Sequence, residues 1–366
     1  MKFIKYIIPA LAALALASCS GQTDNEEYDL SLRPDNTEIY ADGSQSVYFT
    51  VSYGSADVSR SKDMYLAYEK DGKRTELQAG KNSFSTSEAG TYVFQAFYDN
   101  GQKTLSSPSV TISAKEPEKV ESRYYKKMLA MEFTSIHCTY CPILAETVRN
   151  IEKAYPGRLI PAAFHCDNMG TDPMSVTLNG KFYENVVNNN DGGLPLFAFD
   201  LRKSNTDIVN EYSLIESEIK SQIEKYPAAG GVAISTTYDI NGGTIDVKAM
   251  FRTEIKGEYR CHVFLVEDGI EYTQAGHDGT SPYVHDNVVR AIASDNVFGS
   301  KLNQGKALEA DTEYTYSKSF TTGEGWNIEK MRVIACLMKA DRDGSIHMNN
   351  SNVCAVGGSA EYLINE

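Results

Sequence analysis

The sequence has little of what a nucleic-acid-binding or membrane-spanning protein needs. Lys and Arg number 35 against 49 Asp and Glu, which gives a formal net charge of −14. This shortage of positive charge argues against nucleic acid as a partner and against electrostatic adhesion to anionic membranes. Beyond the first residues no apolar run reaches roughly 18 residues, so the sequence predicts no spanning helix. Ser-His-Asp, Walker and dinucleotide motifs are also missing, and we expect no cofactor.

The N-terminus has the pattern of a bacterial lipoprotein signal. A basic start and a short apolar stretch end in the lipobox Leu16-Ala17-Ser18-Cys19. We therefore expect residues 1–18 to be a signal peptide and residues 19–27 to be a tether held by acylation of Cys19. An ordinary signal peptide cleaved near Ala17 is the alternative.

This signal predicts an outer-membrane protein that is anchored by lipid. Its removal takes Lys2 and Lys5 and lowers the net charge from −14 to −16. The acidic residues that follow Cys19 resemble the surface-export signal of some Gram-negative anaerobes. A surface-exposed position is therefore one hypothesis, and the periplasmic face is the other.

The length of 366 residues implies two or three domains. Residues 28–114 alternate apolar and polar positions between turn signals, which predicts an all-β sandwich. Glu88-Ala-Gly-Thr-Tyr92 resembles the tyrosine corner of immunoglobulin-like domains, although Phe94 stands where an antibody domain has its cysteine. Residues 115–123 are charged, contain a proline and are interpreted as a linker.

Residues 124–228 alternate strand-like and helix-like segments, and their number suits a thioredoxin-like α/β domain. The last segment, residues 229–366, predicts a second β-sandwich with a loop-rich excursion over about 268–308. The expected architecture is thus an α/β domain flanked by two all-β domains. The expected strands of the α/β part are 127–134, 158–165 and 196–199, and the expected helices are 141–154, 179–188 and 207–225.

Cys138-Thr-Tyr-Cys141 joins a predicted strand to a predicted helix, and Pro142 follows directly. Two cysteines separated by two residues at such a junction form the redox motif of thioredoxin-like proteins. A thiol at a helix N-terminus faces unpaired N–H groups and the positive end of the helix dipole, which lowers its pKa. The spacing predicts a Cys138–Cys141 disulfide that takes part in thiol–disulfide exchange.

Two further residues favour a redox site. Glu132 lies six residues before Cys138, and alternation directs it inward with Met128 and Ala130. A buried carboxyl group has a raised pKa that suits proton transfer. Gly193-Leu-Pro195 precedes a predicted strand, at the place of the cis-proline of thioredoxin-like proteins. We therefore expect Cys138, Cys141, Glu132 and Pro195 to form the site.

Other cysteines and histidines leave more than one interpretation. His137, if protonated, would favour the Cys138 thiolate, and an exposed histidine without effect is the alternative. His165-Cys166 suggests a metal ligand set, but zinc needs four converging ligands and we predict no metal. Cys166 is then a buried strand thiol or a third redox partner. Cys336 and Cys354 are candidates for a disulfide between neighbouring strands.

The stretch from Glu132 to Pro142, with Gly193-Leu-Pro195, resembles the thioredoxin superfamily. The whole chain, with its lipobox and with Val263–Ile270 and Tyr283–Arg290, resembles the 28-kDa outer-membrane protein family of Gram-negative anaerobes. The first resemblance implies that Cys138 attacks, that Cys141 resolves and that Pro195 shapes the substrate groove, with protein thiols or disulfides as partners.

Two functions follow from these patterns. The first is a lipid-anchored thiol–disulfide oxidoreductase. The second is a non-enzymatic surface lipoprotein in which the Cys138–Cys141 bond is structural and the β-domains bind a protein or an extracellular glycan.

Overall fold

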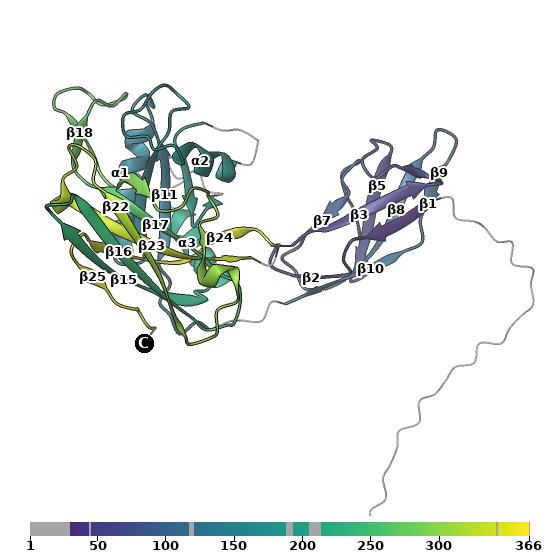
Figure 1. Ribbon diagram of the computed structural model, residues 1–366. Coiled ribbons are helices and arrows are strands. Elements are labelled where there is room, and N and C mark those ends of the chain that lie inside the picture. The colour runs from purple at the N-terminus through teal and green to yellow at the C-terminus, as the bar shows by residue number, and fades with distance from the viewer. Residues whose placement is uncertain are drawn as a thin grey trace, which may run out of the picture. The chain divides into compact units, whose positions relative to one another are not determined.

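The computed structural model describes residues 30–43, 45–116, 121–187, 193–204, 214–341 and 343–365. The predicted signal peptide, Cys19 and the tether lie outside the described residues. No helix in the described ranges is long and apolar enough to cross a bilayer. The chain divides into two compact units (Figure 1).

The first unit comprises most of the chain up to residue 115. A four-stranded sheet contains β1, β3, β4 and β7, and a six-stranded sheet contains β2, β10, β8, β5, β6 and β9. Phe49, Phe84, Tyr92 and Phe94 lie buried between the sheets with ring centroids 4.7–4.9 Å apart in three pairs. The strands are β1 (Leu30–Pro34), β2 (Glu38–Tyr40), β3 (Val47–Tyr53), β4 (Ala56–Asp57), β5 (Met64–Lys70), β6 (Lys73–Glu76), β7 (Ser83–Phe84), β8 (Gly90–Asp99), β9 (Thr104–Ser106) and β10 (Val110–Lys115).

The second unit consists of residues 116–366 together with two short segments of the preceding chain. It is built on a nine-stranded sheet of order β14-β13-β11-β12-β20-β17-β23-β24, with β21 paired to β17. β11 and β12 are parallel and almost wholly buried, as the near-continuous apolar character of their sequences requires. These strands are β11 (Met128–Thr134), β12 (Leu159–His165), β13 (Leu196–Phe199), β14 (Arg202–Lys203), β17 (Arg260–Glu267), β20 (Val288–Ile292), β21 (Ser300–Lys301), β23 (Met331–Ala340) and β24 (Ile346–Ala355).

The remaining elements of this unit cover the large sheet or project from it. They are a four-stranded sheet of β15 (Gly230–Asp239), β16 (Thr244–Thr253), β22 (Glu313–Thr321) and β25 (Ser359–Ala360), a hairpin of β18 (Ile270–Tyr272) and β19 (Tyr283–His285), the helices α1 (Cys141–Ala154), α2 (Asn179–Val187) and α3 (Ile215–Lys225), and the short 3-10 turns η2 (Leu302–Gly305) and η3 (Ile328–Lys330).

The predicted thioredoxin-like α/β domain between two separate all-β domains is wrong. The described chain is mostly β-sheet, and α1, α2 and α3 are its only α-helices in the described ranges. The strands expected to form the α/β domain lie in one sheet with strands from the C-terminal part. β12 pairs in parallel with β20 through Ala163 and Val288, and β20 continues to β17. If the edge of β12 were open, its backbone N–H and C=O groups would be unpaired. β20 pairs with some of these groups.

The individual elements of this segment nevertheless match the expectation closely. α1 begins at Cys141 and ends at Ala154, and α2 covers Asn179–Val187. α3 is described from Ile215, while residues 207–213 of the predicted third helix lie outside the described residues. Local patterning therefore placed the elements, and the pairing between distant strands decided the fold.

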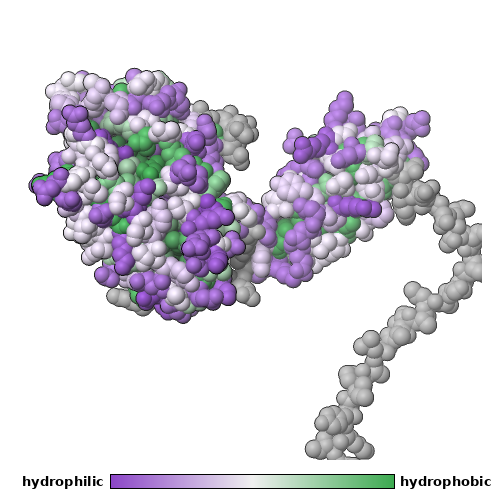
Figure 2. Space-filling model, viewed as in Figure 1, coloured by the Kyte–Doolittle hydropathy of each residue, from purple (hydrophilic) through white to green (hydrophobic). Residues whose placement is uncertain are grey.

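Each face of the large sheet is covered by a different set of elements. Leu129, Met131 and Phe133 face α2, whereas Met128 and Ala130 face α1 and α3. β17 and β23 also contribute to a third apolar cluster with the four-stranded sheet. Figure 2 shows a surface that is mostly hydrophilic on both units, with smaller apolar patches.

Candidate functional site

The predicted Cys138–Cys141 disulfide is confirmed. Its S–S distance is 2.10 Å and its Cα–Cα distance is 5.4 Å. Cys141 is the first residue of α1, and Pro142 occupies a first-turn position where its missing N–H costs nothing. Cys138 and Cys141 are only 1% and 3% exposed, whereas Tyr140 between them is 65% exposed. The peptide turn is therefore open to solvent while the two cysteines are enclosed.

Glu132 is buried in β11, as its position in the sequence predicts. It is 4% exposed and faces α1 together with Met128 and Ala130. Burial raises the pKa of its carboxyl group to about 7, although the positive charge of Arg149 on α1 opposes the shift. A carboxyl group with a pKa near neutrality can both accept and release a proton under physiological conditions.

A small polar cavity joins Glu132 to the disulfide. Its lining includes Glu132, Cys141, Arg149, His165, Tyr283 and His285. We call it the Glu132 cavity. Three of these residues come from β11 and α1, one from β12 and two from the β18–β19 hairpin. The site is thus shared between the middle and the C-terminal parts of the chain.

Pro195 lies beside the strand that leads to the disulfide. The Leu194–Pro195 peptide bond is cis, as the sequence predicts. β13 starts at the next residue and is antiparallel to β11, with Leu196 opposite Phe133. This register brings Pro195 to the end of β11 from which the chain continues to Cys138.

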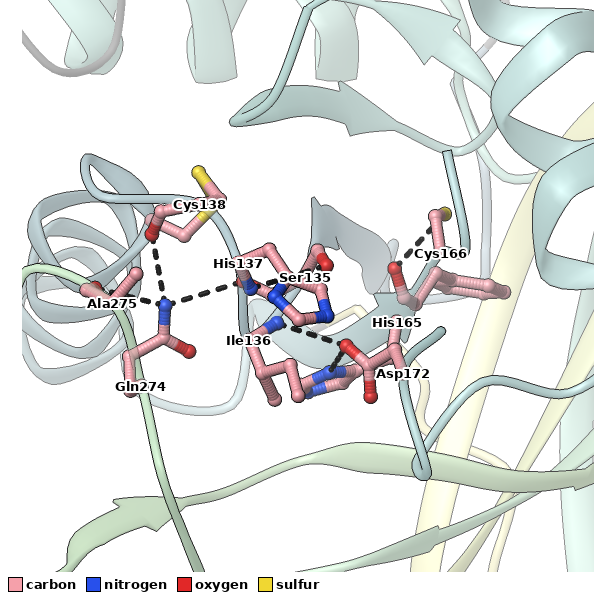
Figure 3. Close-up of a disulfide and its surroundings, with 11 residues drawn as sticks. Ser135, Ile136, His137, Cys138, His165, Cys166, Asp172, Gln274 and Ala275 are labelled. Atoms are coloured by element: carbon pink, nitrogen blue, oxygen red, sulfur yellow. Dashed lines mark hydrogen bonds and ion pairs between the residues drawn. A yellow bond between two sulfur atoms is a disulfide. The ribbon is translucent and has the colours of Figure 1, made fainter. Parts of the chain in front are cut away.

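The loop between β18 and β19, residues 273–282, contacts the disulfide turn from below in Figure 3. We call it the capping loop. The Gln274 amide donates hydrogen bonds to the carbonyl oxygens of Ser135 (3.2 Å) and Cys138 (2.8 Å). The Ala275 N–H donates to the Ile136 carbonyl at 2.8 Å. Each such bond contributes roughly 1 kcal/mol of net stability, so the capping loop holds the turn in place.

Gly276 is required by the close approach of the capping loop. Its φ is +82°, and a Cβ atom there would lie 2.1 Å from the Thr139 carbonyl oxygen. No L-residue with a side chain fits without a backbone movement.

The contact of the capping loop with the disulfide was not predicted from the sequence, because only the neighbouring segment Tyr283–Arg290 carried a recognisable pattern.

His165, which the sequence offered as a metal ligand, is paired with Asp172. Its Nδ1 lies 2.8 Å from Asp172 Oδ2, and both side chains are buried. Burial raises the pKa of Asp172, but hydrogen bonds from His165 and from the Ile136 and Met174 N–H groups outweigh it, so the pKa lies below its usual value. The described ranges contain no group of three or more metal-ligating side chains.

The other two candidates are His137 and Cys166, and each has a hydrogen-bond partner in a nearby part of the chain. The His137 imidazole lies 3.0 Å from the Thr171 carbonyl oxygen, which fixes it against the loop after β12. Cys166 is a free thiol, 1% exposed, and burial raises its pKa to about 12. Figure 3 shows Cys166 apart from the disulfide, so the structure does not bring it together with Cys138.

The predicted Cys336–Cys354 disulfide is wrong, because both residues are free thiols. β23 and β24 pair so that Cys336 stands opposite Ser351 and Cys354 stands opposite Val333. Successive residues of a strand face opposite sides of the sheet. Cys336 consequently belongs to the cluster with α2, and Cys354 to the cluster with the four-stranded sheet.

Fold and site together define a β-rich two-unit protein with a buried disulfide beside a small polar cavity. Residues 198–356 match the family described as Outer membrane protein Omp28. This match confirms the predicted resemblance to the 28-kDa outer-membrane proteins over that range. The matched range contains the capping loop and His285, while the disulfide precedes it. No curated protein matches the chain.

One solved structure supports the fold at low sequence identity. HBP35 of Porphyromonas gingivalis superposes with a TM-score of 0.54 at 18% identity, over 64% of this chain and 77% of that one. A structural-genomics protein of Agrobacterium tumefaciens covers 65% of this chain and 97% of its own, with a TM-score of 0.43 and 13% identity. The first of these similarities concerns the fold alone.

Proposed function

We propose that this chain is an outer-membrane protein of the cell envelope, anchored through lipid on Cys19, whose β-rich units contact a partner. The partner class is a protein or an extracellular glycan, and the Cys138–Cys141 disulfide serves as a structural bond. The Omp28 match supports the location. The enclosure of both cysteines under the capping loop carries the structural role.

The physical reason lies in how disulfides exchange. A thiolate must approach one sulfur directly before the bond can break. Cys138 and Cys141 are 1% and 3% exposed, so a folded partner meets mainly the Tyr140 side chain. A bond of this kind constrains the turn that leads from β11 into α1.

Reduction kinetics test the structural role. An excess of a small dithiol is added to the folded chain, and free thiols are counted by mass spectrometry after alkylation. We expect the Cys138–Cys141 bond to be reduced at the rate of unfolding, and to be reduced rapidly once urea is added. Rapid reduction of the folded chain, with unchanged circular dichroism, would refute this role.

The anchor and the location have their own tests. Cys19→Ala should abolish incorporation of labelled palmitate and release the chain from the membrane fraction. Ser18→Ala is the matched control at the neighbouring position. Protease treatment of intact cells then separates the two faces of the outer membrane, because a surface-exposed chain is cut and a periplasmic chain is protected until lysis.

A second candidate function is thiol–disulfide exchange, and the Glu132 cavity is the observation that favours it. Glu132 and Cys141 line the same cavity, and the pKa of Glu132 is about 7. In this function the protein acts in its reduced form, with both cysteines as thiols supplied by a dithiol reductant. The Cys138 thiolate attacks one sulfur of a substrate disulfide, breaks that bond, displaces the other sulfur as a thiolate and forms a mixed disulfide. Cys141 then attacks Cys138, Glu132 accepts the Cys141 proton, and the substrate leaves as a thiol after taking a proton back. Pro195 shapes the approach to Cys138.

Trapping distinguishes the two functions. Cys141→Ala removes the resolving thiol, so an exchanging protein accumulates mixed disulfides through Cys138 in cells. Cys138→Ala is the matched control and should trap nothing. Equal absence of adducts in both variants would contradict exchange and leave the structural role.

A further inference from the structure

His285 reaches the Glu132 cavity from the C-terminal hairpin. It is the last residue of β19 and is 5% exposed. Its imidazole ring lies against His165, with ring centroids 5.2 Å apart, and against Tyr283, at 4.7 Å. β19 therefore brings a second imidazole ring, after that of His165, to a cavity that is also lined by a carboxyl group and a cysteine.

The hydrogen bonds of His285 define its tautomer. The Thr273 carbonyl accepts a hydrogen bond from the imidazole, and among the described residues Nε2 has no partner. The bonded atom is thus Nδ1, which carries the proton. Burial, followed by the neighbouring His165, lowers the pKa of His285 to about 4, so the ring is neutral. A neutral ring with a protonated Nδ1 leaves Nε2 as a buried acceptor that needs a donor.

The Glu132 cavity contains the group that can satisfy it. A carboxyl group with a pKa of about 7 is protonated in about half of the molecules at neutral pH and then has an O–H to donate. A buried water molecule that bridges two such groups is common where a polar cavity offers two to four partners. Tyr283 and Arg149 line the same cavity and are hydrogen-bonded to each other.

We infer that His285 is a positioning residue for Glu132: one water molecule in the cavity joins the Glu132 carboxyl to His285 Nε2, and this bridge holds the proton on the carboxyl. A hydrogen bond to the neutral form of an acid raises its pKa. The bridge deepens the thiol–disulfide exchange proposed above, because it stabilises the form of Glu132 that returns a proton to the departing thiol. Its existence does not require that exchange takes place.

The charged groups around the bridge shift the pKa values of Glu132 and His285 both upward and downward. Arg149 on α1 lowers the pKa of Glu132, whereas Glu152 on the same helix and Asp286 after β19 raise it. At His285, Asp172 favours the charged ring while burial and His165 oppose it. These charges are unchanged in a variant that alters only the acceptor at position 285, so such a variant isolates the bridge.

Asparagine and glutamine at position 285 provide a matched pair. The Asn amide takes the place of Nδ1 and keeps the Thr273 contact, whereas the Gln amide oxygen takes the place of Nε2 and keeps the acceptor in the cavity. The pKa of Glu132 is measured by carbon-13 NMR on the oxidised, detergent-solubilised full chain with labelled glutamate carboxyl groups. Glu132→Gln assigns the signal, and thermal unfolding checks that each variant is folded.

We expect His285→Asn to lower the Glu132 midpoint by about one pH unit, a tenfold change in the protonation equilibrium, and His285→Gln to leave it within a few tenths of the wild-type value. A wild-type midpoint in His285→Asn, or equal shifts in both variants, would overturn the inference. A measurement without a His285 variant guards against misfolding: nitrogen-15 spectra should show Nε2 unprotonated, and its shift should change in Glu132→Gln. A protonated Nε2, or one that Glu132→Gln leaves unmoved, would also overturn it.

Failure of this inference and failure of exchange give different results. The titration is performed on the oxidised protein and requires no turnover. Trapping through Cys138 without a shift in His285→Asn would keep the exchange function and reject the bridge. A shift without trapped adducts would keep the bridge and reject exchange.

Discussion

The stability of the second unit should depend on pH through Glu132. The carboxyl group has an ordinary pKa of 4.5 when the chain is unfolded and about 7 when it is folded. Because the folded value is the higher one, the unfolded chain loses this proton first as pH rises. The contribution of Glu132 to stability is fully present below pH 4.5 and is lost progressively up to pH 7. One pKa unit corresponds to about 1.4 kcal/mol, so the total loss is about 3 kcal/mol.

Glu132→Gln removes this titration and leaves the rest of the chain unchanged. Urea unfolding of the oxidised wild type and of the Gln variant is compared at pH 4.5 and at pH 8. The single tryptophan, Trp326, lies in the second unit and reports its unfolding by fluorescence. The Gln variant should gain about 3 kcal/mol relative to the wild type between the two pH values. An equal difference at both values would refute a raised pKa at Glu132.

Three further predictions follow from the contacts of the site. Gly276→Ala should cost more than about 1 kcal/mol in thermal unfolding and accelerate reduction of the disulfide, because its Cβ would meet the Thr139 carbonyl; Gly279→Ala, with φ +75° and open space around it, is the control and should leave the reduction rate unchanged. Asp172→Ala should cost about 3 kcal/mol in urea unfolding, since it leaves buried His165 and two N–H groups without their acceptor; a cost below about 1 kcal/mol would contradict this. The four free cysteines of the described residues are buried, so an aromatic disulfide reagent should react with them only after unfolding, and reaction in the folded state would contradict their burial.

The local elements followed from residue patterning. The cysteine spacing with Pro142 placed the start of α1, and the confirmed disulfide is a consequence of one helical turn. Alternation in β11 correctly buried Glu132, because Met128 and Ala130 share its side of the strand. The cis bond at Pro195 was also expected from its position before β13.

Pairing between distant strands did not follow from these patterns. The sequence of a strand does not indicate which other strand will pair with its edge. β12 pairs with β20, which lies more than a hundred residues later in the chain. For the same reason Cys336 and Cys354 were wrongly joined: only the register of β23 against β24 shows that they face opposite sides.

The sequence by itself determined the disulfide, the helix that begins at it, the burial of Glu132 and the resemblance of the C-terminal part to an outer-membrane family. These depend on spacing and alternation within a few residues of one another. Tertiary structure alone decided that the middle and C-terminal segments share one sheet. It also decided that Gln274, Gly276 and His285 reach the disulfide turn and the Glu132 cavity. The physical reason is that a contact across more than a hundred residues is set by strand pairing and packing, which local sequence does not encode.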